Sequence, residues 1–206
     1  MTRIVKKPEE RRHEIISAAR ELFQEQQYEK TTMKDVMDKL GIAKGTIYHY
    51  FKSKEELLEA VVEQTGDDYV AAMQTLLDGT EGNALERFQI LIASGNIAED
   101  EEHLLDQLHR PGNVGMHTRQ LAITISKLAP LYASVIQQGC EEGIFQTEYP
   151  LECAEFLLSG IQFLTDIGMH PWSQTDLIRR VSAFPTLVET QLQAPKGSFS
   201  FLAEQI

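Results

Sequence analysis

The 206-residue sequence lacks the features that would place it in a membrane or in a secreted disulfide-rich class. It has only two cysteines, Cys140 and Cys153, too few for a disulfide framework. No apolar run approaches the roughly 20 residues that cross a bilayer. The N-terminus, MTRIVKKPEERR, is basic but has no apolar stretch behind it, as a secretory signal would. We therefore expect a soluble cytoplasmic protein with reduced thiols.

Catalytic, cofactor and metal motifs are also missing. The sequence contains no GxSxG, HExxH or P-loop, and no GxGxxG after a strand, so we expect neither an enzyme nor a cofactor. His103, His109 and His117 lie close in sequence, but their spacings do not bring all three to one helical face. Because no CxxC pair accompanies them, we interpret them as surface or pocket histidines and expect no metal site.

No segment has a convincing strand pattern, and helical periodicity predicts an all-α fold. A helix is expected to begin at Pro8, and glycine or proline punctuation separates the later ones. The expected ranges are 32–40, 44–51, 53–77, 83–97 or beyond, 100–110, 114–142, 150–168 and 173–192. Pro130 and Pro185 should kink two of these. The tail, residues 194–206, contains proline, glycine and serines, and is expected to be extended or frayed.

Charge is distributed unevenly along the chain. Residues 1–54 contain 12 Lys or Arg and 8 Asp or Glu, a net +4; the remaining residues contain 7 and 23, a net −16, which together give −12. Because salt screens charges beyond about 10 Å, a basic N-terminal domain can attract phosphate while the acidic body stays away from it.

Residues 31–51 predict a helix-turn-helix. Thr32 and Asp35 have the spacing of a capping box, which begins the first helix. Gly41 follows the last apolar residue of that helix, where a residue tolerant of positive φ is favoured. In the second helix, Ile47 and Phe51 are four residues apart and form its buried face. A short glycine-containing turn between two such helices is typical of DNA-binding proteins.

The segment GIAKGTIYHYFKSKEELL, with RRHEIISAARELFQEQQYEKTTMKDV before it, resembles the tetracycline-repressor (TetR) family of transcriptional regulators. The resemblance is specific over about residues 10–60 and weaker beyond. It implies a helix-turn-helix domain over 1–54, a larger helical effector-binding and dimerisation domain over 55–193, and a tail over 194–206. It also implies a homodimer that binds a near-palindromic operator.

The resemblance assigns DNA contacts to residues in and beside the motif. Gly45 offers no side chain, so any contact there is a close backbone approach. Either Tyr48 or Tyr50 is expected to have a packing role instead. The full set implied is Thr32, Lys34, Lys44, Gly45, Thr46, Tyr48, His49, Tyr50 and Lys54.

The resemblance also implies a small-molecule cavity in the body and a dimer interface formed by its last two long helices. The candidate lining residues are Met73, Phe88, Ile92, Leu104, Met116, His117, Ile123 and Phe163. The candidate interface comprises 150–168 and 173–192, with Phe156, Ile161, Phe163, Leu164, Leu177, Val181, Leu187 and Val188 on the apolar faces. Any of these residues also suits the core of a single chain.

We therefore predict a DNA-binding transcriptional regulator, a repressor that a small-molecule effector releases from its operator. Two alternatives remain. In the first, the body binds another protein, which a solid core without a cavity would favour. In the second, the chain is an enzyme that uses the first domain for targeting, which the missing motifs disfavour.

Overall fold

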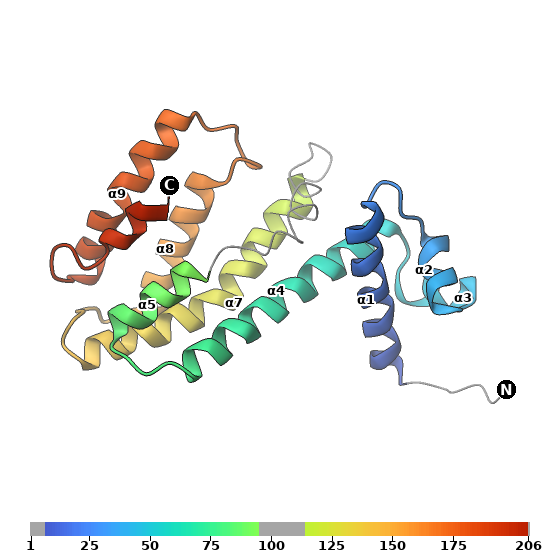
Figure 1. The fold of residues 1–206 in the computed structure, drawn as a ribbon, viewed down its shortest axis with the longest axis horizontal. Helices are drawn as coiled ribbons and strands as arrows, with labels where there is room; N and C mark the ends of the chain where they lie inside the picture. The colour runs from blue at the N-terminus through green and yellow to red at the C-terminus, as the bar shows by residue number, and fades with distance from the viewer. Residues whose placement is uncertain (1–6, 95–113, 206) are drawn as a thin grey trace. The chain divides into compact units, whose positions relative to one another are not determined.

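The computed structural model describes residues 7–94 and 114–205, and within these ranges the chain is helical with no strand (Figure 1). The elements are α1 (Pro8–Gln26), α2 (Met33–Leu40), α3 (Lys44–Tyr50), α4 (Lys54–Asp78), α5 (Ala84–Ala93), α7 (Val114–Glu141), α8 (Pro150–Thr165), α9 (Gln174–Leu192) and the 3₁₀-helix η3 (Ser200–Gln205). The all-α prediction is confirmed for this part of the chain. The residues form two compact units, and the division follows Gly66 inside α4, whereas the sequence prediction placed it at residue 54.

The first unit packs α1, α2 and α3 around one apolar core that continues into the first turns of α4. Each helix contributes one stripe of side chains at helical spacing, as an amphipathic helix does. These side chains are at most 9% exposed: Ile15, Ile16, Ala19, Leu22, Phe23, Val36, Ile47, Phe51, Leu57, Leu58 and Val61. The core therefore fixes which face of α3 points outward.

The body, the second unit, has its own core, formed by α5, α7, α8, α9 and the last turns of α4. Helix α7 packs against both α5 and α8, and α8 packs against α9. A close approach occurs where Gly139 of α7 meets the ring of Phe145, because a Cβ at Gly139 would lie 2.1 Å from that ring. Glycine is therefore required for Phe145 to enter the core.

The C-terminal tail packs against the body, so the prediction of an extended or frayed segment is wrong for its described part. Phe199 is fully buried, and its ring lies 5.1 Å from that of Phe88 and 5.7 Å from that of Phe145. The buried Glu189 carboxylate of α9 accepts hydrogen bonds from the backbone N–H groups of Gly197 (2.8 Å) and Phe199 (3.2 Å). Figure 1 shows η3 beside α9.

Two helices end earlier than predicted. Helix α5 ends at Ala93 rather than near Ile97. Helix α8 ends at Thr165, because the Asp166 carboxylate accepts bonds from the N–H groups of Gly168 and Met169 and so forms a turn. The predicted helix over 100–110 lies outside the described residues. None of the described helices is long and apolar enough to span a membrane.

Candidate nucleic-acid interface and ligand cavity

The two helices of the motif begin and end as the sequence predicts. The Asp35 N–H donates to the Thr32 hydroxyl (3.2 Å), and the Thr32 N–H donates to the Asp35 carboxylate (2.7 Å). The Thr32 hydroxyl also donates to the Asp35 carboxylate (2.8 Å), and this bond, followed by that from the Thr32 N–H, lowers the pKa of Asp35 below its usual value. Gly41 ends α2 with a φ of 62°, the left-handed conformation expected there. The capping-box prediction for α2 is therefore confirmed, so Thr32 has a structural role in addition to any contact with DNA.

Helix α3 presents polar groups on the side opposite its buried residues. Ile47 is fully buried, whereas Lys44 and His49 are exposed and Tyr48 is partly buried. The Lys44 ammonium lies 5.6 Å from the centre of the Tyr48 ring, so a cation and a phenol lie together on this face. A Cβ at Gly45 would meet no described atom within 4 Å, so the backbone there is open to a close approach.

The remaining predicted contacts of the first unit differ in how accessible they are. Thr46 and Tyr50 are partly buried on α3, and the Tyr50 ring packs edge-on against that of His49 at 5.1 Å. Lys34 is exposed and forms an ion pair with Asp38 on the same helix. Surface pairs of this kind contribute little to stability, so phosphate can compete for the ammonium of Lys34.

Lys54 is engaged within the protein. Its ammonium donates to the backbone carbonyls of Tyr28 (2.9 Å), Thr31 (3.1 Å) and Glu29 (3.5 Å), and lies 4.1 Å from the centre of the Tyr28 ring. Burial lowers the pKa of Lys54, whereas burial and the nearby Glu55 raise the pKa of Tyr28 to about 12. Because an ammonium has three N–H donors, these three carbonyls compete with phosphate for them. Lys54 thereby holds the α1–α2 connection against the start of α4.

The capping box at the start of α4 is only half formed. The Ser53 hydroxyl accepts from the Glu56 N–H (3.1 Å). The Glu56 carboxylate returns its bond to the N–H of Lys52 (2.6 Å) rather than to that of Ser53. The Lys52 ammonium in turn donates to the Tyr48 carbonyl (2.9 Å), which links the end of α3 to the start of α4.

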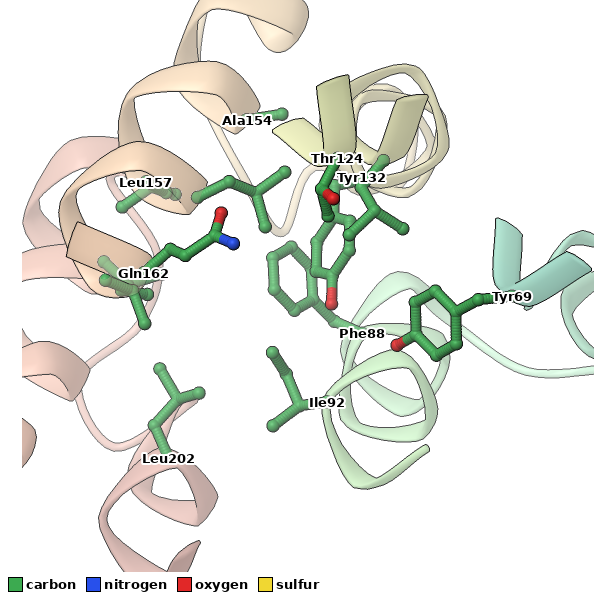
Figure 2. A pocket seen from close by; sticks show the side chains of 13 residues that line it. Tyr69, Phe88, Ile92, Thr124, Tyr132, Ala154, Leu157, Gln162 and Leu202 are labelled. Atoms are coloured by element: carbon green, nitrogen blue, oxygen red, sulfur yellow. The ribbon is translucent and has the colours of Figure 1, made fainter. Parts of the chain in front are cut away.

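The body contains a cavity of about 210 Å³ (Figure 2). Its walls come from α4, α5, α7, α8, α9 and η3, and most of the side chains are aliphatic or aromatic. The lining residues are Tyr69, Phe88, Ile92, Thr124, Leu128, Tyr132, Ala154, Leu157, Leu158, Ile161, Gln162, Val188 and Leu202. Two of the predicted residues, Phe88 and Ile92, are among them. The predicted Leu104 and the side chain of Met116 lie outside the described part of the chain.

The other predicted lining residues lie elsewhere. Phe163 is 50% exposed on α8, and Met73 is buried in the core beside the cavity. Ile123 is not on the face of α7 that carries the cavity residues Thr124, Leu128 and Tyr132. These three residues repeat every four positions, as residues on one helix face do.

His117 is buried but does not line the cavity. Its Nε2 atom lies 3.0 Å from the Asp166 carboxylate, which also forms the turn after α8. This contact gives His117 a structural role between α7 and the end of α8. Within residues 7–94 and 114–205, no cluster of three His, Cys, Asp or Glu side chains suits a metal ion.

Comparisons with known proteins identify the family. Residues 15–61 match the family model "Bacterial regulatory proteins, tetR family", and residues 96–187 match "Tetracyclin repressor-like, C-terminal domain". The HTH-type transcriptional regulator YfiR of Bacillus subtilis, itself uncharacterized, is 39% identical over 173 residues, which cover 73% of this chain and 76% of YfiR. The chain belongs to the TetR family.

Less similar proteins also match this chain over most of its length, in sequence or in fold. The HTH-type transcriptional repressor KstR2 of Mycobacterium tuberculosis is 27% identical over 156 residues, which cover 74% of this chain and 78% of that one. The crystal structure of RolR in complex with resorcinol has a TM-score of 0.64 at 17% identity, and covers 96% of this chain and 95% of RolR. The protein is therefore a DNA-binding transcriptional regulator with the fold of the TetR family.

The TetR-family assignment does not identify the polar residues of the cavity, which sequence reasoning missed. Tyr69, Thr124, Tyr132 and Gln162 lie in helices whose remaining inward residues are mostly apolar. A polar residue at an inward helical position was the available signal, most clearly for Gln162 within the segment FLLSGIQFL. Leu202 had no such signal, because the tail was expected to lie outside the fold.

Proposed function

We propose that this TetR-family regulator represses transcription as a homodimer bound to a near-palindromic operator, and that an effector in the body cavity releases it. The arrangement of α3 is the observation that supports DNA binding in this proposal. Ile47 and Phe51 hold one face in the core, so Lys44, Gly45 and Tyr48 are left for the major groove. We expect the protein to act in the cytoplasm, where bacterial chromosomal DNA lies.

The residues of the motif take different roles in this proposal. Lys44, Thr46, Tyr48 and His49 contact bases or phosphates, because amines, hydroxyls and imidazole groups match the hydrogen-bonding edges in a major groove. Outside this set, Lys34 and Tyr50 supply contacts to the DNA backbone, and Thr32 does so while capping α2. The open backbone at Gly45 lets α3 approach the groove closely. Lys54 acts indirectly, by holding the α1–α2 connection, because three carbonyls already occupy its ammonium.

The exposed faces of α8 and α9 support the homodimer. Phe156 is 72% exposed and Phe163, seven residues further along α8, is 50% exposed, so the two lie on one face of that helix. Leu187 of α9 is 58% exposed. Aromatic residues in such positions are typical of protein interfaces. The other candidate residues, Ile161, Leu164, Leu177, Val181 and Val188, are partly or fully buried within the chain and contribute less.

The cavity supports a small-molecule effector over a protein partner. A solid body core would have favoured the partner alternative, whereas this body contains a partly open cavity of about 210 Å³. The related fold of RolR, crystallised with resorcinol, supports the same conclusion. The effector would act by binding more tightly to a conformation that is unsuited to the operator, and so shift the population away from DNA.

The first experiment is to select bound sequences from random duplex DNA with the purified protein. We expect an enriched near-palindrome, whose half-sites are separated by one or more helical turns. The selected duplex then tests α3 through Tyr48→Ala, which should weaken binding by roughly 5- to 100-fold if a specific contact is lost. Tyr149→Ala, at a 60% exposed tyrosine of the body, is the matched control and should bind normally.

The result of this test is decisive for α3. Circular dichroism of both variants should match that of the parent protein, because neither tyrosine is part of a core. Unchanged affinity of Tyr48→Ala would refute the assignment of this residue. Failure to enrich any sequence, even at low salt, would refute sequence-specific binding by the motif.

A further inference from the structure

The polar groups of the cavity define the chemistry that it can hold. Among its described lining residues none is charged, and the polar side chains are those of Tyr69, Thr124, Tyr132 and Gln162. Figure 2 shows the Gln162 amide pointing inward from α8 and the Tyr69 hydroxyl pointing inward from the opposite wall. The rings of Phe88 and Tyr132 lie between them. The site is thus apolar, with neutral hydrogen-bonding groups on opposite sides.

Three of these polar groups have no hydrogen-bond partner within the described part of the protein. The Thr124 hydroxyl accepts from Gln120 (3.3 Å), whereas no hydrogen bond joins the Tyr69 hydroxyl, the Tyr132 hydroxyl or the Gln162 side-chain amide to another described residue. Tyr132 as a whole is only 8% exposed. Because these groups line the cavity, they are available to hydrogen-bond with an occupant.

The size of the cavity limits the occupant. A cavity of about 150 Å³ in another protein is known to accept benzene, so about 210 Å³ accommodates one substituted ring. Drug-sized ligands usually occupy pockets of about 300–1,000 Å³. The aromatic walls formed by Phe88 and Tyr132 also favour edge-to-face contact with a ring.

We propose that the cavity binds a compact, uncharged molecule of about one ring, whose oxygen-containing substituents hydrogen-bond to Tyr132 and Gln162. This inference rests on the proposed function, in which the cavity is the effector site. It adds the chemical class of the effector and the two side chains that select it.

Anions are disfavoured for two physical reasons. A carboxylate would lose its hydration without meeting a cation, because no Lys, Arg or His is among the described lining residues. The surrounding charge is also unfavourable, since residues 55–206 carry a net −16. Burial raises the pKa of Tyr69 and of Tyr132, so both phenols keep their protons at neutral pH and remain neutral donors.

A matched set of probes tests this chemistry by calorimetric titration of the full-length protein without DNA. The set comprises 3-hydroxybenzyl alcohol, 3-hydroxybenzoate and toluene, which differ in charge and in hydrogen-bonding groups but little in size. We expect the alcohol to bind with one site per chain. The benzoate and toluene should each bind at least roughly tenfold more weakly, because one buries an unpaired charge and the other forms no hydrogen bond.

Conservative variants locate the binding. Tyr132→Phe and Gln162→Leu keep the bulk of each side chain but remove its hydrogen-bonding group. Each should lower the affinity for 3-hydroxybenzyl alcohol by roughly 3- to 10-fold. Toluene should bind these variants no more weakly than it binds the parent. Tyr149→Phe and Gln146→Leu alter exposed residues outside the cavity and should leave both affinities unchanged.

The outcomes separate this inference from the proposed function. The inference is overturned if the benzoate binds as tightly as the alcohol, if the alcohol does not bind, or if neither cavity variant changes its affinity. An anion that bound in the cavity and released the selected duplex would overturn the inference and leave the proposed function intact. The alcohol binding as expected without releasing DNA would support the inference and contradict the release step.

Discussion

At the scale of single residues, Gly45 tests how closely α3 approaches DNA. Its φ is not in the left-handed region and a Cβ would meet no described atom within 4 Å, so the fold itself does not require glycine there. Gly45→Ala should raise helix stability by up to about 1 kcal/mol. It should nevertheless weaken binding to the selected duplex, because the added methyl group intrudes on the backbone contact. Thermal unfolding and fluorescence anisotropy measure the two effects, and unchanged affinity would contradict the close approach.

Asp35 gives a residue-scale prediction about pH. Its pKa is lowered in the folded protein, so the stability that it contributes is present above the unfolded value of about 3.9 and is lost as pH falls through the lower folded value. Asp35→Asn should therefore be less stable than the parent near neutral pH, and the difference should shrink below about pH 4. Urea unfolding at several pH values measures it. Glu81→Gln, at an exposed loop residue, is the control and should show no such convergence.

At the scale of elements, the C-terminal segment is part of the body core. Phe199→Ala should destabilise the body by about 3–5 kcal/mol, because it removes a fully buried ring that contacts Phe88 and Phe145. Denaturant unfolding measures the loss, with Ser200→Ala at an exposed neighbouring position as the control. A loss below about 1 kcal/mol would mean that the segment does not stabilise the body in solution.

At the scale of the whole molecule, the proposed function makes DNA binding depend on the pairing of two chains. In a two-fold interface, Phe156→Glu introduces a charge on both sides, so it should convert the dimer to monomers. Binding to the full operator should fall at least roughly tenfold, since each monomer then reads one half-site alone. Sedimentation equilibrium and anisotropy measure both effects. Leu76→Glu, at an exposed apolar residue of α4, is the control; a Phe156→Glu variant that remained dimeric would refute this interface.

The division of charge also belongs to the whole molecule. The net +4 of residues 1–54 and the net −16 of the remainder follow from composition alone. Because phosphate attraction is short-ranged in salt, this division explains how a chain with a net charge of −12 binds DNA.

The sequence alone determined the features that depend on neighbours within one or two helical turns. The Thr32–Asp35 capping box, the Gly41 helix end and the burial of Ile47 need only local spacing, and all were predicted correctly. The Asn83 cap of α5 is equally local, because its side chain accepts from N–H groups two and three residues ahead. Local hydrogen bonds and hydrophobic periodicity depend only on the order of nearby residues along the chain.

Only the tertiary structure decided the features that join distant residues. Lys54 meets carbonyls 23 to 26 positions away in sequence, which gives this lysine an internal supporting role that local spacing did not indicate. The tail packs into the core because the Phe199 N–H donates to the Glu189 carboxylate and the Phe199 ring contacts that of Phe88. No local pattern in residues 194–206 indicates these contacts. The cavity likewise depends on side chains from six elements, so its polar residues follow from packing geometry rather than from spacing along any one helix.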